Sequence, residues 1–172
     1  SLDTVKNNVQ YGLCTRTFSQ MLFSFETACG ARFIEILSER VSKFYATDDG
    51  RQDYIRQVGV AKKKEDGQSF EIIKPLVGCT PSDFLDALAL VRKSTQPFVD
   101  NGESNIQLRR LGKVAVQVAK DTYPRAVELW SNVGTHLGRS IYINSAYVML
   151  HGYCGTYDHS LLRKKCWAMQ MN

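Results

Sequence analysis

The sequence has few features that point directly to an enzyme. Its 12 glycines are dispersed, so no glycine-rich loop precedes a helix as phosphate-cradling and dinucleotide-binding motifs require. A Gly-x-Ser-x-Gly motif for a nucleophilic serine is absent. Cysteine and histidine pairs at zinc-binding spacing are also absent. We therefore expect no cofactor and no metal, and an enzyme is the least favoured class.

Long apolar runs are missing as well. The longest candidate, residues 141–150, is interrupted by Asn144 and Ser145 and is about half the ~20 residues that a membrane span needs. The first residues lack the basic-then-apolar layout of a signal peptide. The chain has an odd number of scattered cysteines, which favours reduced thiols: Cys14, Cys29, Cys79, Cys154 and Cys166. These features predict an intracellular, cytoplasmic protein without a membrane span.

The composition is that of an ordinary globular protein. The chain has 172 residues, of which 44% are hydrophobic and 23% charged, so we expect a single domain over residues 1–172 with one core. The 22 Lys and Arg residues outnumber the 17 Asp and Glu residues and give a net charge of +5. A mild basic excess favours anionic partners such as nucleic acid.

Apolar residues recur at helical spacing in the first third of the chain. The pattern predicts helices over residues 2–13 and 18–29, the second one ending at Gly30. A third helix is expected where the apolar stripe consists of Phe33, Leu37, Val41 and Phe44. A short helix or turn is expected over residues 51–57.

The spacing then changes to alternation. Val58 and Val60 alternate with glycine and alanine, Phe70 and Ile72 alternate in a second run, and residues 65–67 (Glu-Asp-Gly) lie between them. This pattern predicts a β-hairpin over residues 57–74 as the only strand pair in the chain.

Helical spacing resumes after the hairpin. Thr80 and Pro81 predict the start of a helix that ends near Pro97. Further helices are expected over residues 104–120, from Pro124, over residues 141–150 as the most buried helix, and after Asp158. The fold class is therefore mainly α, with about seven or eight helices in one compact, bundle-like domain and a single inserted β-hairpin.

One cluster has side chains that could bind a metal or form a thiol–imidazole pair. It lies between the last two predicted helices and consists of His151, Cys154, Asp158 and His159. Because it lacks the matched pairs that zinc geometry demands, an ordinary interhelical loop is the favoured interpretation. His136 is interpreted as a cation at the C-terminal end of a helix rather than as a base.

Three basic clusters are candidates for contacts with nucleic-acid phosphates. They lie at the hairpin tip, on the helix over residues 104–120 and on the last helix, and their residues are Lys62, Lys63, Lys64, Arg109, Arg110, Lys113, Arg163 and Lys164. Tyrosines nearby could stack on bases. The alternative is that each cluster is a solvated surface, or blunts a strand edge in the case of the lysines.

These features favour a non-enzymatic helical protein that binds nucleic acid through its phosphate backbone, RNA and DNA being equally possible. An oligomeric nucleoprotein or coat-type subunit would fit. The alternative is a helical adaptor that binds a protein partner, or itself, and has no nucleic-acid role. Neither prediction rests on a recognised motif.

Overall fold

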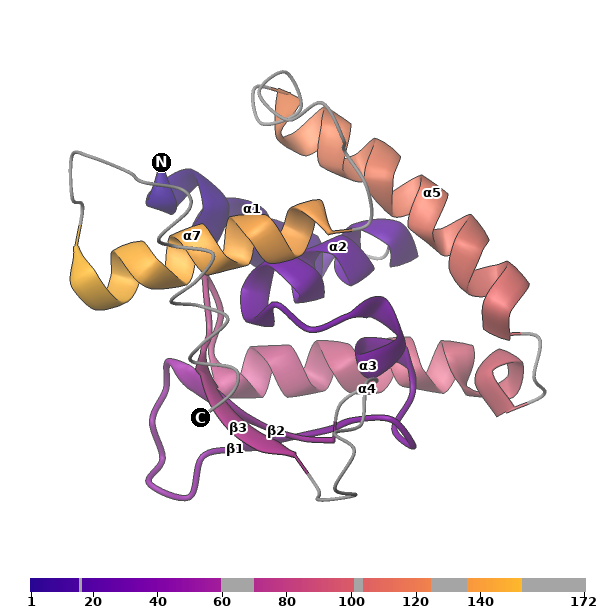
Figure 1. The fold of residues 1–172 in the computed structure, drawn as a ribbon, viewed down its shortest axis with the longest axis horizontal. Helices are drawn as coiled ribbons and strands as arrows, with labels where there is room; N and C mark the ends of the chain where they lie inside the picture. Colours follow the sequence, from indigo (N-terminus) through magenta and orange to yellow (C-terminus); the bar gives the residue numbers. More distant parts are fainter. Residues whose placement is uncertain (16, 60–69, 101–103, 125–135, 153–172) are drawn as a thin grey trace.

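The computed structural model describes residues 1–15, 17–59, 70–100, 104–124 and 136–152. This part of the chain is mainly helical, as predicted, but it contains a three-stranded sheet instead of a single hairpin (Figure 1). Its helices are α1 (Leu2–Cys14), α2 (Phe18–Cys29), α3 (Phe33–Leu37), α4 (Pro81–Asp100), α5 (Ser104–Thr122) and α7 (Leu137–His151). Its strands are β1 (Lys43–Ala46), β2 (Tyr54–Val58) and β3 (Glu71–Pro75).

The core is built around α2. Every residue from Met21 to Cys29 is buried, and the helix packs against α1, α5 and α7. The prediction that residues 141–150 form the most buried helix was wrong, because α7 buries only one face, through residues such as Ile141 and Tyr142. α2 needs apolar or small residues all round because neighbouring helices surround it.

The sheet is antiparallel in the order β1-β2-β3. Its register pairs Phe44 with Gln57 and Ile55 with Lys74. Phe44 and Ile55 are buried, and the Phe44 ring lies 5.4 Å from the ring of Phe84 on α4. The sheet thus has a face packed on α4, which runs alongside it in Figure 1.

Two of the predicted boundaries were wrong. The third helix ends at Leu37; of the rest of its apolar stripe, Val41 lies in the turn that follows and Phe44 belongs to β1. Residues 54–57 belong to β2 rather than to a short helix or turn. The apolar residues of the stripe are spaced by four and three residues, which fits a helix. Pairing of β1 with β2 instead satisfies the backbone hydrogen bonds of this segment and still buries Phe44. The base of the predicted hairpin is present, with Val58 paired to Glu71. Its turn lies outside the described residues.

The start of α4 follows the sequence closely. The Thr80 hydroxyl oxygen accepts a hydrogen bond from the Asp83 amide at 3.2 Å, and the Asp83 carboxylate accepts one from the Thr80 amide at 3.3 Å. This is a reciprocal cap of the first turn. The helix continues through Pro97 to Asp100, so the predicted exit at Pro97 was wrong. Burial of Phe84, Leu88 and Val91 holds α4 in place before the proline is reached.

Candidate phosphate-binding site

A tight turn between α2 and α3 begins the candidate site. Gly30 ends α2 in the left-handed region at φ 67°, where a side chain would be strained. A Cβ atom on Gly30 would also collide with the ring of Tyr142 from α7. The Tyr142 hydroxyl donates to the Pro75 carbonyl at 3.1 Å. Glycine at this position therefore lets α7 pack directly on the end of α2.

The turn places Arg32 at the start of α3, as its N-cap residue. The Arg32 guanidinium donates to Glu35 Oε1 at 2.8 Å, and the Arg32 amide donates to Glu35 Oε2 at 2.8 Å. The Glu35 side chain is 4% exposed, whereas that of Arg32 is 31% exposed. The buried carboxylate of Glu35 thus fixes the Arg32 guanidinium, which remains partly exposed to solvent.

The start of α7 supplies the other half of the site. His136 is the N-cap residue of α7 and is exposed. Arg139 follows one helical turn later, so both side chains lie on the same face of the helix. The Arg139 guanidinium donates through Nε to the Gly30 carbonyl at 2.9 Å. Arg139 is therefore fixed to the turn that carries Arg32.

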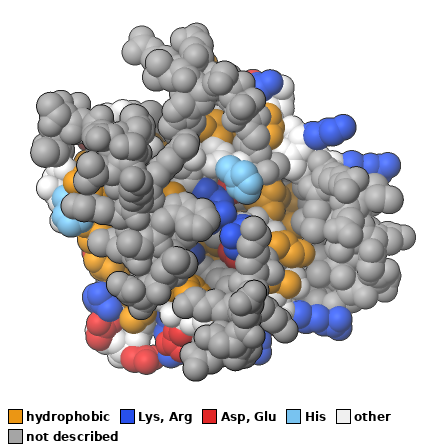
Figure 2. Space-filling view, viewed as in Figure 1, with side chains coloured by type: hydrophobic (Ala, Val, Ile, Leu, Met, Phe, Trp, Pro, Cys, Tyr) orange, Lys and Arg blue, Asp and Glu red, His pale blue; other side chains and the backbone are white. Residues whose placement is uncertain are grey.

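Arg32 and Arg139, which we call the arginine pair, are close enough to affect each other electrostatically. Burial lowers the pKa of Arg139, and the positive charge of Arg32 lowers it further. Arginine remains charged under such shifts. Figure 2 shows Lys and Arg side chains beside a histidine near the middle of the face on which α7 lies.

Two guanidinium groups and a helix N-terminus form a favourable environment for an anion. Guanidinium groups can bind the oxygens of a phosphate in a bidentate way. The first backbone amides of α7 add partial positive charge. The imidazole of His136 can donate or accept a proton next to that anion. The arrangement is chemically suited to bind a phosphodiester and to act on it.

A buried hydrogen-bond network connects Arg32 to the sheet. Gln57 on β2 is fully buried, and its Nε2 donates to Ser42 Oγ at 2.8 Å, to the Gly59 carbonyl at 3.3 Å and to Glu35 Oε2 at 3.4 Å. Gly59 is the last described residue before the predicted hairpin tip. Glu35 therefore joins the arginine pair to the root of the hairpin.

Arg92 on α4 fixes α3 from the other side. Its guanidinium donates to the carbonyls of Ile36 at 2.8 Å, Glu35 at 3.1 Å and Ser42 at 2.7 Å. The bonds to Glu35 and Ile36 satisfy carbonyls of α3, a helix of only five residues, and the bond to Ser42 fixes the segment between α3 and β1. A helix this short has little stability of its own, so Arg92 holds the element that positions Arg32.

The structure places few of the phosphate contacts predicted from the sequence. Arg110 and Lys113 are exposed on α5, which carries none of the side chains of the arginine pair. Arg109 also lies on α5, but its side chain is not described. The remaining predicted contacts lie outside the described residues: Lys62, Lys63, Lys64, Arg163 and Lys164.

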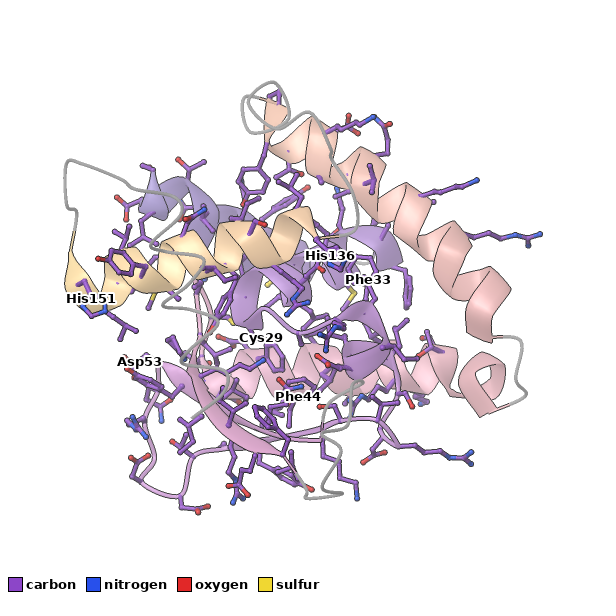
Figure 3. All side chains as sticks on the ribbon, viewed as in Figure 1. Cys29, Phe33, Phe44, Asp53, His136 and His151 are labelled. Atoms are coloured by element: carbon purple, nitrogen blue, oxygen red, sulfur yellow. The ribbon has the colours of Figure 1, made fainter. Side chains whose placement is uncertain are left out.

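Two histidines singled out from the sequence lie among the described residues. His136 is the N-cap residue of α7 (Figure 3); the helix predicted to end near it lies in residues 125–135, outside the described residues, so its place at the C-terminal end of that helix stays a prediction. Gly138, in the first turn of α7, packs against Glu26. His151 lies in the last turn of α7, with its ring 4.7 Å from that of Tyr147. Its predicted partners Cys154, Asp158 and His159 lie outside the described residues, and the described part contains no group of His, Cys, Asp or Glu able to hold a metal.

Sequence reasoning did not identify the arginine pair. Arg32 and Arg139 are isolated basic residues, whereas the predicted phosphate contacts lie in runs of neighbouring lysines and arginines. Two local signals were available. His136 and Arg139 are spaced to share a helix face, and Gly30 stands two residues before Arg32 with Glu35 three residues after it. Only the fold shows that these two segments meet.

Comparison with known proteins gives structural similarity alone. No family model and no curated protein sequence matches the chain. None of the helices among the described residues is long and apolar enough to cross a membrane.

The similar solved structures are protelomerases bound to DNA. Protelomerase tela covalently complexed with substrate DNA has a TM-score of 0.63 at 18% identity, over 94% of this chain and 52% of that chain. The same enzyme complexed with a DNA hairpin product has a TM-score of 0.64 at 17% identity, over 94% and 51%. Protelomerase TelK complexed with substrate DNA has a TM-score of 0.52 at 16% identity, over 90% and 32%. This chain thus spans about half the length of the tela chains, and the likeness shows a shared fold.

Proposed function

We propose that this chain binds DNA by holding a backbone phosphate between Arg32 and Arg139. The observation that carries the proposal is the hydrogen bond from Arg139 to the Gly30 carbonyl, which fixes Arg139 to the turn that carries Arg32, so that the charges of the two arginines act on each other. His136 lies three residues before Arg139, at the start of α7. Each arginine is anchored at one end by the protein, Arg32 by Glu35 and Arg139 by the Gly30 carbonyl. Such anchoring reduces the entropy lost when a phosphate is bound.

DNA is favoured over other anionic partners because the structures that share this fold were solved with DNA. The overall charge of +5 is consistent with a polyanion. Lys62, Lys63 and Lys64 would add contacts to neighbouring phosphates from the hairpin whose root Gln57 holds. Arg109, Arg110, Lys113, Arg163 and Lys164 are further candidates for such contacts.

We also propose that the site cleaves and rejoins a DNA strand. In that reaction a side-chain hydroxyl would attack the phosphorus, forming one P–O bond while the bond to the leaving deoxyribose oxygen breaks. The attacking hydroxyl loses its proton to a base or to water, and His136 gives a proton to the leaving oxygen. The arginine pair would stabilise the negative charge that develops on the nonbridging oxygens. Support comes from the tela structures, in which protein and substrate DNA are covalently joined.

A tyrosine is the best-suited nucleophile, because a phenolate with a pKa of about 10 is a good leaving group when the strand is rejoined. Tyr142 is excluded by its buried ring and its hydrogen bond to the Pro75 carbonyl. Cys29 is excluded because burial raises the pKa of its thiol to about 11. Among the other tyrosines, we take as candidates the three that follow the arginine pair along the chain: Tyr147, Tyr153 and Tyr157.

Binding is tested with a fluorescent duplex DNA and single substitutions of the arginine pair. Arg32→Ala and Arg139→Ala should each weaken binding by about ten- to a hundredfold, because each removes a charge-assisted contact worth about 1.5–3 kcal/mol. Lys93→Ala and Lys120→Ala are matched controls at exposed positions of α4 and α5, and each should weaken binding by less than about fivefold. Equal losses of DNA affinity at all four positions would mean that the arginine pair contributes no more than an ordinary surface charge, and would contradict the proposed site.

Strand cleavage is tested with a pool of labelled duplexes of randomised central sequence. After denaturation in detergent, a strand attached to protein should migrate slowly in a gel. Replacing Tyr147, Tyr153 and Tyr157 in turn with phenylalanine should abolish this adduct in one variant only, while DNA binding remains. Binding without any adduct in the wild-type protein would leave a DNA-binding protein and refute the cleavage proposal.

A further inference from the structure

A buried carboxyl group packs against Gly138, the residue before Arg139 on α7. Glu26, on the central helix α2, is 2% exposed. Gly138 on α7 packs against it so closely that a Cβ atom at Gly138 would lie 3.1 Å from Glu26 Cβ and Cδ. Arg139 is the next residue along α7, and its positive charge acts on the Glu26 carboxyl group across the α2–α7 contact.

Glu26 has few partners for a buried acid. Among the described residues, its Oε2 atom has no hydrogen-bond partner. The opposite charge that acts on it is Arg139, and the Gly138 amide is also close. The other ionisable groups around this contact are Cys29 on α2, Arg32 and Glu35 at α3, and Lys74 on β3.

We propose that Glu26 is a positioning residue that competes with the DNA phosphate for the Arg139 guanidinium. When Glu26 is protonated, the full positive charge of Arg139 attracts the phosphate. When Glu26 is ionised, its negative charge partly neutralises that of Arg139. The inference deepens the proposed function and rests on it. It assigns to the site a proton-linked affinity for DNA.

The electrostatics give the direction of this effect. Burial raises the pKa of Glu26 to about 8, despite the opposing effects of Arg139 and the Gly138 amide. A bound phosphate adds negative charge near the carboxyl group and raises that pKa further. DNA binding and protonation of Glu26 therefore favour each other, so affinity for DNA falls as the pH rises above about 8.

The experiment measures the affinity of the whole chain for a fluorescent duplex from neutral pH to about one unit above the pKa of Glu26, at constant ionic strength. Wild-type affinity should fall by about three- to tenfold over this range, because the release of one proton changes affinity by at most tenfold per pH unit. Glu26→Gln, which mimics the protonated acid, should bind as the wild type does at neutral pH and show no alkaline decrease. Glu39→Gln, on the exposed loop after α3, should keep the wild-type profile.

Two results would overturn the inference alone. An alkaline decrease that persists in Glu26→Gln would assign the titration to another group, such as Lys74. A variant that binds weakly at every pH would mean that an ionised Glu26 supports Arg139 rather than competing with phosphate. If instead the wild type binds no DNA at any pH, the proposed function itself fails.

A measurement on the wild type covers the case in which the variant does not fold. Carbon-13 NMR of the glutamate carboxyl groups should show one group that titrates near pH 8 and whose pKa rises when DNA is added. A set of glutamates that all titrate below pH 6, as ordinary glutamates with a pKa of about 4.3 do, would contradict the inference.

Discussion

The two guanidinium groups of the arginine pair are held by different kinds of partner. Arg32 is paired with the carboxylate of Glu35 at 2.8 Å, whereas Arg139 donates a hydrogen bond to a backbone carbonyl. The charges of Glu35 and Glu26 both act on Arg139, that of Glu35 more strongly. Arg32 contributes a fixed geometry, because both oxygens of Glu35 hold it.

Burial of Glu26 predicts a specific dependence of stability on pH. Its pKa is raised by the fold from 4.5 to about 8, so the unfolded state releases a proton that the folded state retains. The free energy of unfolding should therefore fall by about 1.4 kcal/mol per pH unit as the pH rises between these two values, and the loss should level off above the higher one. Urea unfolding across this range measures the slope, and Glu26→Gln should be flatter by that amount. Identical slopes would show that Glu26 is ionised in the folded protein.

Gly30 is predicted to be required both for its backbone conformation and for its close contact with Tyr142, and a comparison with Gly50 separates the two effects. Gly30→Ala places a side chain at φ 67° and against Tyr142, and it should lower the free energy of unfolding by about 2–4 kcal/mol. Gly50 has a similar φ of 69° with no atom near its Cβ position. Gly50→Ala should therefore cost only about 1 kcal/mol. Equal losses in thermal or urea unfolding would mean that the Tyr142 contact is unimportant.

At the scale of elements, α3 depends on its neighbours. It has five residues, and its carbonyls are bound by Arg92 from α4 while its Glu35 is bound by Gln57 from β2. The position of Arg32 is thus set by a helix and a strand that are distant in the sequence.

Replacing Arg92 tests this dependence. Arg92→Met would leave three carbonyls without their donor, so we expect a loss of about 2–4 kcal/mol in stability. We also expect weaker DNA binding under conditions where the variant is still folded, because Arg32 loses its support. Lys93→Met, at an exposed neighbouring position, should change stability by less than about 0.5 kcal/mol. An Arg92 variant as stable as the control would contradict the role given to this residue.

Sequence patterns predicted the long helices well and the sheet poorly. α1, α2 and α5 have regular apolar spacing and clear ends, such as Gly30, and they were predicted within a few residues. β1 was missed because four residues with one buried position, Phe44, cannot show alternation. The arginine pair was missed because its two residues are 107 positions apart. No local sequence pattern predicts that the turn between α2 and α3 packs against the start of α7.

For the molecule as a whole, the proposed phosphate site lies where the helical and sheet-containing parts meet. α2 and α7 bring Gly30 and Arg139 together, and Gln57 on β2 connects Glu35 to Gly59. The chain thus leaves the described sheet at Gly59, close to the network that holds Arg32, just before the segment with the three lysines.

The hairpin lysines are predicted to add affinity without sequence preference. Replacing Lys62, Lys63 and Lys64 with alanine should weaken binding to unrelated duplexes about equally and reduce the slope of log affinity against log salt by about 0.9 for each lost phosphate contact. Stability should change by less than about 0.5 kcal/mol. An unchanged salt slope would remove the hairpin from the binding surface.

The most direct test of the central claim is the salt dependence of duplex binding for the double variant Arg32→Ala/Arg139→Ala. If both guanidinium groups hold the same phosphate, the slope of log affinity against log salt should decrease by about 0.9, which corresponds to one phosphate, and the two single variants should be strongly non-additive. A decrease of about 1.8 would mean that the arginines contact separate phosphates. An unchanged slope with unchanged affinity would contradict the phosphate site altogether.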